Sequence, residues 1–292
     1  MMPDHREGFV EFQGRNIWFR MDGDLNSGIP LLILHGGPGV PHDYLTPLVA
    51  LSDDRPVILY DQLGCGNSDK SEDISLYTLD YFTQELEAVR WGLDLKEVHI
   101  LGQSWGTMLA VQYILTKNPQ GVHSLILSSP CLSASRWHDD QRRYINELPA
   151  DIREIILKSE IEGTCDSPEY QEAMMVFYRN HVCRMDPWPE CLEKSMEKMA
   201  FQVYEHMWGP SEYTITGTLK NYEHAHNLQN ITIPTLFTCG RYDEASPEST
   251  RYYQSMLPGS RIVIFEDASH SHHLEQETAY LNTVREFLAS VE

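Results

Sequence analysis

Short apolar runs alternate with amphipathic segments along most of the chain. The runs are rich in Val, Ile and Leu, as in strands buried on both faces of a parallel sheet, and span residues 30–34, 56–60, 98–101, 122–128, 234–238 and 261–265. Between them, apolar residues recur every three or four positions, which predicts helices over 43–51, 78–91, 108–115, 247–256 and 275–288. This alternation indicates an α/β fold, in which a mostly parallel sheet carries helices on both faces.

Two regions depart from this pattern. In residues 7–21 apolar and polar positions alternate on both sides of Gly14, which predicts a hairpin of half-buried strands at a sheet edge. Residues 131–226 contain no strand-like run, and instead predict a helix over 149–160 and another starting at the Ser167-Pro168 pair. Further apolar residues then recur at helical spacing, as is typical of packed core: Leu192, Met196, Met199, Val203 and Met207. We therefore predict a helical cap (131–226) inserted between a first (1–130) and a second part (227–292) of an α/β core.

The segment Gly102-Gln103-Ser104-Trp105-Gly106 lies where the apolar run 98–101 passes into the helix predicted over 108–115. A serine at the apex of such a strand-turn-helix is positioned as a nucleophile, and the tight turn leaves no space for a Cβ two residues before or after it. The amides at the start of the helix face the place where negative charge develops during acyl transfer. Ser104 is therefore the predicted nucleophile.

A serine hydroxyl needs a base and a group that orients the base. Asp243 follows the strand predicted at 234–238 and His270 follows the last strand, at 261–265, so both share the carboxyl edge of the sheet with Ser104. Their local competitors are Glu244 and Asp267 for the acid, and His272 and His273 for the base. The His-x-His spacing could also ligate zinc, but no further ligand pattern completes such a site, so no metal is predicted.

Acyl transfer also needs two amides that stabilise the oxyanion. One is predicted to be that of Trp105, and the other that of Gly37 in the loop His35-Gly36-Gly37-Pro38-Gly39. Taken alone, this glycine-rich loop could cradle a phosphate, but it lacks the Lys-Ser/Thr pair of a P-loop.

Composition limits the possible partners. The net charge of −21 argues against nucleic acids and anionic membranes. We expect a cytoplasmic protein with free thiols. The six cysteines show no framework spacing, the start has no apolar signal core, and no apolar run reaches bilayer length.

Over nearly its whole length, the chain resembles the proline iminopeptidases, which are α/β-hydrolases that remove N-terminal residues from peptides, and especially the tricorn-interacting aminopeptidase type. Six motifs carry the resemblance: the 35–39 loop, Asp61-Gln62-Leu63-Gly64-Cys65-Gly66, the 102–106 turn, Gly209-Pro210-Ser211-Glu212, Gly240-Arg241-Tyr242-Asp243-Glu244 and Ser269-His270.

This resemblance implies an α/β-hydrolase fold with a helical cap over the active site. It also implies that Glu212 and Glu244 bind the free amino group of the substrate, as carboxylates in a poorly hydrated cavity do strongly. The expected activity is that of a serine aminopeptidase without a cofactor. It acts on short peptides or aminoacyl amides with a free N-terminus, releasing proline or other, mostly apolar, residues.

The same scaffold is compatible with other functions. An amino-acid amidase or esterase would use the same scaffold, and a non-catalytic receptor could be built on it. Epoxide hydrolases and dehalogenases of this fold are disfavoured, because they use an aspartate where this chain has Ser104.

Overall fold

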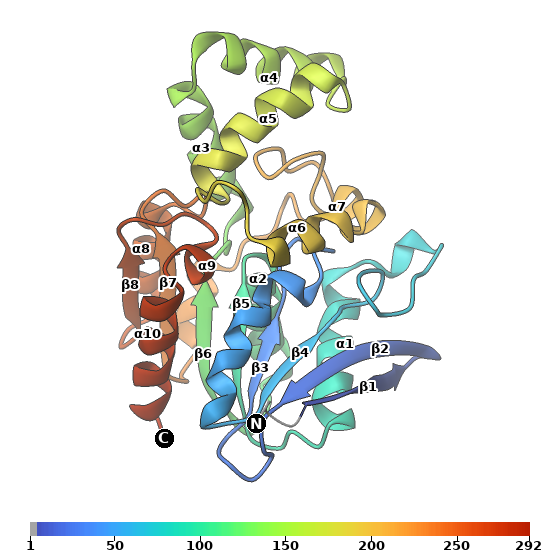
Figure 1. The fold of residues 1–292 in the computed structure, drawn as a ribbon, viewed down its shortest axis with the longest axis vertical. Coiled ribbons are helices and arrows are strands. Elements are labelled where there is room, and N and C mark those ends of the chain that lie inside the picture. Colours follow the sequence, from blue (N-terminus) through green and yellow to red (C-terminus); the bar gives the residue numbers. More distant parts are fainter. Residues whose placement is uncertain (1–4) are drawn as a thin grey trace.

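The computed structural model describes residues 5–292 and is built around one eight-stranded sheet (Figure 1). Its strand order is β1-β2-β4-β3-β5-β6-β7-β8. The strands are β1 (His5–Phe12), β2 (Arg15–Asp22), β3 (Leu31–Leu34), β4 (Val57–Tyr60), β5 (Val98–Gln103), β6 (Val122–Ser128), β7 (Thr235–Gly240) and β8 (Arg261–Phe265). Strands β3 to β8 run parallel, whereas β1 and β2 form an antiparallel hairpin at one edge. The predicted parallel sheet and edge hairpin are confirmed.

Both faces of the sheet are covered, and central strands such as β3 and β4 are apolar and buried at every position. In β3, Leu32 and Leu34 pack with α1 (Leu79–Gly92), α2 (Trp105–Lys117) and α8 (Pro247–Met256) on one face. Leu31 and Ile33 pack on the other face with η1 (His42–Asp53) and α10 (Glu277–Ala289), which follows the short helix α9 (His272–Glu275). The short helices η2 (Ile74–Leu76) and η3 (Ala225–Asn230) lie in connections.

Five α-helices between β6 and β7 lie beyond the carboxyl ends of the strands (Figure 1). They are α3 (Ala134–Glu147), α4 (Ala150–Glu162), α5 (Pro168–His181), α6 (Glu190–Glu197) and α7 (Phe201–Met207). The cap helices predicted at 149–160 and after Ser167 correspond to α4 and α5, and the Ser167 hydroxyl caps α5 by accepting from the amide of Tyr170. Within residues 5–292, no helix combines the length and apolar character needed to cross a bilayer.

Four helices differ from the sequence pattern. The helix predicted over 43–51 is the 3₁₀ helix η1, which contains Pro47 and so lacks one backbone donor. The apolar stripe from Leu192 to Met207 is divided between α6 and α7, because the chain leaves helical geometry where the Ala200 amide donates to the Gly39 carbonyl (2.9 Å). Helix α3 has no separate sequence prediction, because the polar residue Gln141 occupies its buried face.

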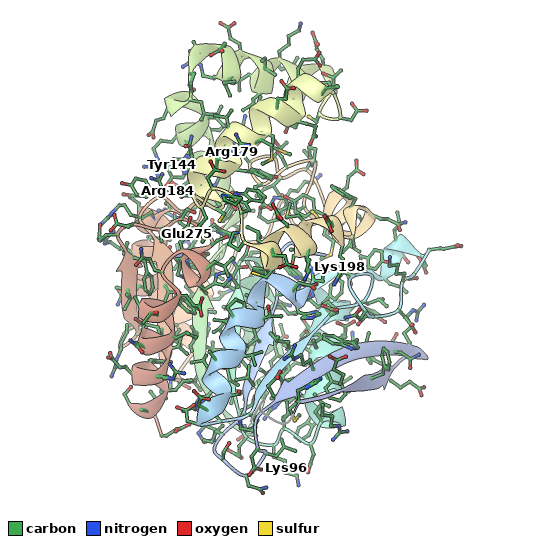
Figure 2. All side chains as sticks on the ribbon, viewed as in Figure 1. Lys96, Tyr144, Arg179, Arg184, Lys198 and Glu275 are labelled. Carbon is green, nitrogen blue, oxygen red and sulfur yellow. The ribbon has the colours of Figure 1, made fainter. Side chains whose placement is uncertain are left out.

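Contacts join the cap to both loops that carry predicted site residues. On one side, the Tyr44 amide donates to the Ser195 hydroxyl (2.8 Å), and Lys198, labelled in Figure 2, pairs with Asp43 (2.6 Å). On the other side, the amides of His270 and Ser271 donate to carbonyls of residues 181 and 182 at the end of α5 (3.0 and 2.9 Å). The cap is therefore attached to η1 and to the histidine loop, and the Ala200 amide attaches it to the oxyanion loop at Gly39.

The turn between β5 and α2 is tightly packed. Ser104 has φ 54° and ψ −121°, a strained conformation for a residue with a side chain. A Cβ on Gly102 would lie 2.3 Å from the Gly106 carbonyl oxygen, and one on Gly106 would lie 2.3 Å from that of Leu34. Both obstacles are backbone atoms. The expected steric role of the two glycines is therefore visible in the packing.

We expect Gly106→Ala to lower the free energy of unfolding by about 3 kcal/mol, because an added methyl must push β3 and α2 apart. Gly163→Ala is the control, since its Cβ would meet no atom within 4 Å and only its φ of +69° is unfavourable. That control should lose about 1 kcal/mol. Urea unfolding measures both values, and equal losses would contradict this account of the turn.

Candidate active site

The seven predicted site residues converge around one small cavity of about 50 Å³. Gly37, Ser104, Glu212, Glu244 and His270 line it. The backbone of Ser104 is fixed by a hydrogen bond from its amide to the Ser128 carbonyl at the end of β6 (2.9 Å). The other two residues lie directly behind the lining: Trp105 is the first residue of α2, and Asp243 bonds to His270.

The His270 ring is held by Asp243 through a hydrogen bond of 2.7 Å between Nδ1 and Oδ1. Asp243 is fully buried and accepts three further hydrogen bonds, from the Ser129 hydroxyl (2.6 Å) and from the amides of Ala245 (2.8 Å) and Gly240 (3.2 Å). With Nδ1 bound to Asp243, Nε2 is the nitrogen available for a serine proton.

The electrostatics suit a charged acid beside a basic imidazole. Burial alone would raise the pKa of Asp243, but the charge and hydrogen bond of His270, with His272 and Ser129, hold it below its usual value of 3.8. Burial would lower the pKa of His270, but the Asp243 carboxylate, with smaller contributions from Glu212 and Glu275, raises it above 6.5. The acid is therefore ionised at neutral pH and strengthens its histidine as a base.

The competing residues are placed differently. His272 is buried behind the site, with Nε2 3.0 Å from the Thr238 hydroxyl, and burial lowers its pKa to about 4. His273 bonds to the Tyr44 carbonyl (3.3 Å), and burial lowers its pKa to about 3. Asp267 is exposed. Of the local candidates, Asp243 and His270 are the pair that hydrogen-bonds at the cavity.

Two backbone segments present amides near Ser104. Trp105 begins α2, so its N–H has no intrahelical acceptor. Gly37 lines the cavity at φ +106°, and a Cβ there would lie 2.6 Å from the Gly39 nitrogen. The arrangement can accommodate an oxyanion between a helix start and a glycine loop.

Glu212 and Glu244 reach the same cavity from opposite sides. Glu212 belongs to the cap segment after α7, and Glu244 follows Asp243 after β7. Neither carboxylate oxygen of Glu244 has a hydrogen-bond partner among residues 5–292, although the side chain is buried and Oε1 lies 3.7 Å from His270 Nε2. Burial, Glu212 and Asp243 raise the pKa of Glu244 well above its usual value, and burial raises that of Glu212 against the opposing effects of His270 and Tyr204.

Comparison with known proteins identifies the chain. The family model described as the α/β hydrolase fold matches residues 29–277. A proline iminopeptidase of Heyndrickxia coagulans is 47% identical over 288 residues, which cover 98% of this chain and 100% of the relative. One from Saccharolobus solfataricus is 39% identical over 290 residues, covering 98% and 93%. The chain belongs to the proline iminopeptidase family.

Solved structures agree with this membership. The proline iminopeptidase of Mycobacterium smegmatis superposes with a TM-score of 0.90 at 34% identity, covering 98% of each chain. The crystal structure of VinJ superposes with a TM-score of 0.95, also at 34% identity, covering 99% of this chain and 100% of that one. The predicted α/β-hydrolase fold and membership of this family of hydrolases are confirmed.

Helix α3 supplies residues to this site that sequence reasoning missed. One face of the helix donates to the backbone carbonyls of all three acids. Trp137 Nε1 bonds to Glu212 (2.8 Å), Gln141 Nε2 to Glu244 (2.9 Å), and the hydroxyl of Tyr144, labelled in Figure 2, to Asp243 (3.1 Å). The spacing of these three residues over two helical turns was the available signal in the sequence. It was obscured because Gln141, a polar residue, occupies a buried position where an apolar residue would indicate a helix face.

Ser129 was also missed. It directly follows β6, and its hydroxyl reaches Asp243 because β6 and β7 are neighbours in the sheet. No motif marks this serine, since its role depends on the strand order.

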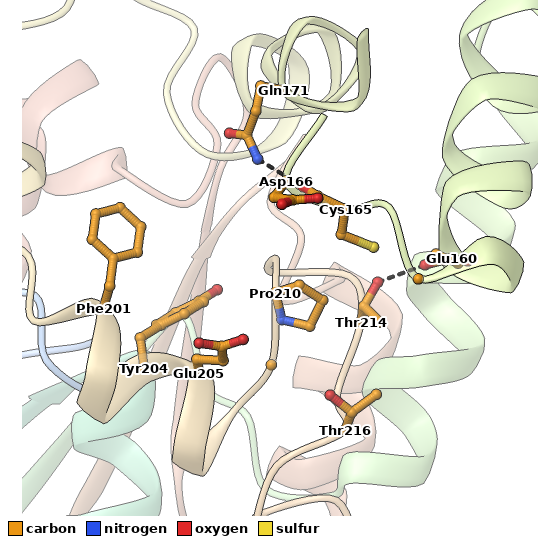
Figure 3. A pocket seen from close by; sticks show the side chains of 12 residues that line it. Glu160, Cys165, Asp166, Gln171, Phe201, Tyr204, Glu205, Pro210, Thr214 and Thr216 are labelled. Carbon is orange, nitrogen blue, oxygen red and sulfur yellow. Dashed lines mark hydrogen bonds between the residues drawn. The ribbon is translucent and has the colours of Figure 1, made fainter. Parts of the chain in front are cut away.

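A larger cavity of about 640 Å³ opens within the cap between α4, α5 and α7 (Figure 3). Glu160 and Thr214, joined by a hydrogen bond, lie on one wall and Phe201 on the opposite one. Tyr204 lines this cavity while its hydroxyl lies beside the Glu212 carboxylate. None of Ser104, Asp243 and His270 lines it, so the candidate chemistry belongs to the smaller cavity.

The raised pKa of His270 predicts the acidic limb of the pH profile. The imidazole must be neutral to accept a proton, so kcat/KM on a neutral ester should rise with pH, with its midpoint above pH 6.5. In Asp243→Asn the residual activity should show a lower midpoint, because the carboxylate that raises the pKa is gone. Initial rates with nitrophenyl acetate measure this. A wild-type midpoint at or below 6.5 would contradict the assignment.

Proposed function

We propose that this proline iminopeptidase family member is a serine aminopeptidase that releases the N-terminal residue of short peptides or aminoacyl amides through an acyl-enzyme. The main support for this proposal is the buried Glu244 carboxylate, which has no hydrogen-bond partner among residues 5–292. It lies in the cavity that Ser104, His270 and Glu212 also line. A buried carboxylate is stabilised by a cation, and an ammonium group held there places the first carbonyl of a peptide at the serine.

In the proposed reaction, His270 Nε2 takes the proton of Ser104 as its oxygen attacks the first carbonyl carbon. The amides of Gly37 and Trp105 stabilise the oxyanion, and Asp243 stabilises the imidazolium. The tetrahedral intermediate collapses when His270 returns the proton to the leaving amine. Water, activated by His270, then attacks the acyl-enzyme and releases the amino acid.

The substrate assignment rests on the cavity and the relatives. The relatives are named proline iminopeptidases, which supports proline as one accepted first residue. The cavity is small and partly apolar, with Val40, Val182, Leu192 and Met196 in its lining, which supports compact apolar residues. A cytoplasmic location is also part of this proposal and is supported by the six free cysteines. The absence of nucleic-acid or membrane partners is part of it too and rests on the acidic composition.

Ser104→Ala should lower kcat by several orders of magnitude, on the order of 10⁴- to 10⁶-fold, because no neighbour can replace the nucleophile. A serine-directed phosphonate should add once to the wild-type protein, and peptide mapping after intact-mass analysis should locate the adduct on Ser104. An adduct on Ser211 or Ser269, or an active Ser104→Ala variant, excludes this mechanism. A protein that never labels would be a receptor rather than an enzyme.

Glu212→Gln and Glu244→Gln should each lower kcat/KM on an aminoacyl arylamide. Losing one member of a buried charged pair costs about 2–5 kcal/mol, or roughly 30-fold to several-thousand-fold. The same variants should change little on nitrophenyl acetate, which carries no amine. Wild-type activity on the arylamide should also fall as pH rises through the pKa of the substrate amine, roughly 7.7–8.0.

The deciding control uses the wild-type enzyme with free and N-acetylated forms of one substrate. If the acetylated form is cleaved equally fast, neither glutamate binds an amine, and the protein is an amidase or esterase on the same scaffold.

A further inference from the structure

The two proposed oxyanion amides come from segments more than sixty residues apart in the sequence, Gly37 after β3 and Trp105 after β5. Both must reach the same oxygen, so their separation must be held closely. A bridge of two hydrogen bonds joins the segments. The Gly36 amide donates to the Tyr44 hydroxyl (2.8 Å), and that hydroxyl donates to Gln103 Oε1 (2.6 Å).

We propose that Tyr44 and Gln103 are positioning residues that hold the oxyanion loop at its working distance from the nucleophile turn. This inference rests on the proposed acyl-enzyme function. Gln103 directly precedes Ser104, and Gly36 directly precedes Gly37, so each end of the bridge is one residue from the reaction centre. Tyr44 also lines the cavity.

The polarity of the bridge is determined by its donors. The Gly36 N–H can only donate, so the Tyr44 oxygen accepts from it and has one proton left to give. That proton goes to Gln103 Oε1. All three residues are buried, and within residues 5–292 the Tyr44 hydroxyl is the one hydrogen-bond partner of both the Gly36 amide and Gln103 Oε1. A phenylalanine at 44 would leave one donor and one acceptor without their partner.

The loop is also packed directly against the bridge. A Cβ on Gly36 would lie 2.7 Å from Gln103 Oε1, 2.9 Å from the Tyr44 hydroxyl oxygen and 3.1 Å from Ser104 Cβ. The absence of a side chain at Gly36 therefore allows the backbone to approach the turn. Because the contact is this close, loss of the hydroxyl frees space into which the loop can shift.

Tyr44 itself is anchored on two sides. Its amide donates to the Ser195 hydroxyl on α6 (2.8 Å), and its carbonyl bonds to His273 Nε2 (3.3 Å). Its ring meets the His273 ring edge to face, with 5.6 Å between centroids. The backbone and ring would thus stay in place in Tyr44→Phe, and the substitution removes the bridge while keeping the packing.

The test compares Tyr44→Phe with wild type on an aminoacyl arylamide and on nitrophenyl acetate. A misplaced oxyanion amide weakens the stabilisation of the transition state but does not change the binding of the substrate in its ground state. We therefore expect kcat to fall by about 10- to 100-fold on both substrates, with KM changed by less than about twofold. This pattern differs from that of Glu244→Gln, which should affect the aminoacyl substrate alone.

Inhibition by an aminoacyl boronic acid is a measurement that would not change if Tyr44 had a merely structural role. Its tetrahedral adduct with Ser104 carries an oxygen in the position of the oxyanion, so its Ki should rise by the same factor by which kcat/KM falls. Tyr113→Phe is the matched control. It removes a buried hydroxyl that accepts a hydrogen bond from Arg90 (3.2 Å), and Tyr113 does not line the cavity. It should lower Tm comparably and leave the Ki unchanged.

Gln103→Met, which removes the acceptor at similar volume, is the second variant and carries the test if Tyr44→Phe does not fold. When both fold, their combination should be no worse than the poorer single variant, because both break one bridge. Wild-type Ki and kcat in either single variant, or additive losses in the double variant, would overturn the proposal. Failure of the wild-type protein itself to bind the boronate would instead refute the acyl-enzyme function.

Discussion

The close approach of backbones at the nucleophile turn is the constraint on which this structure depends. Gly106 lies so near the Leu34 carbonyl that no Cβ fits between them, so α2 starts directly against the end of β3. This contact brings the loop after β3 beside Ser104, which has a strained φ of 54° and lines the small cavity. An oxyanion site can form here because two segments distant in sequence meet without intervening side chains.

Buried negative charge is the second feature that organises the site. Asp243, Glu212 and Glu244 surround His270, and the pKa shifts of the acids go in opposite directions. Asp243 stays ionised because four hydrogen bonds compensate its burial. Glu244 has no such partner, and an ammonium group from a substrate would provide one. Hydrogen bonds thus keep Asp243 charged for catalysis, whereas burial without a partner leaves Glu244 to be charged by pairing with a cation.

The cap completes this arrangement rather than merely covering it. Helix α3 donates side-chain hydrogen bonds to the backbone of all three acids, and α6 holds Tyr44 through Ser195. The end of α5 accepts hydrogen bonds from the amides of His270 and Ser271. The histidine loop, the loop of Asp243 and Glu244, and η1 are therefore attached to cap backbone or side chains, so the geometry of these core segments depends on residues inserted between β6 and β7.

The sequence by itself determined the alternation of strands and helices, the turn around Ser104 and the order of Ser104, Asp243 and His270, because these follow from local periodicity, glycine sterics and strand ends. It also placed Glu212 and Glu244, through resemblance to a family. Only the tertiary structure decided which neighbours serve these residues. Ser129 meets Asp243 because β6 lies beside β7, and Tyr44 meets Gln103 because β3, which the chain leaves just before η1, lies beside β5. The division of the Leu192–Met207 stripe at Ala200 likewise follows from its bond to Gly39. Such contacts join positions far apart in the chain, and no local pattern records which distant backbone will come within hydrogen-bonding distance.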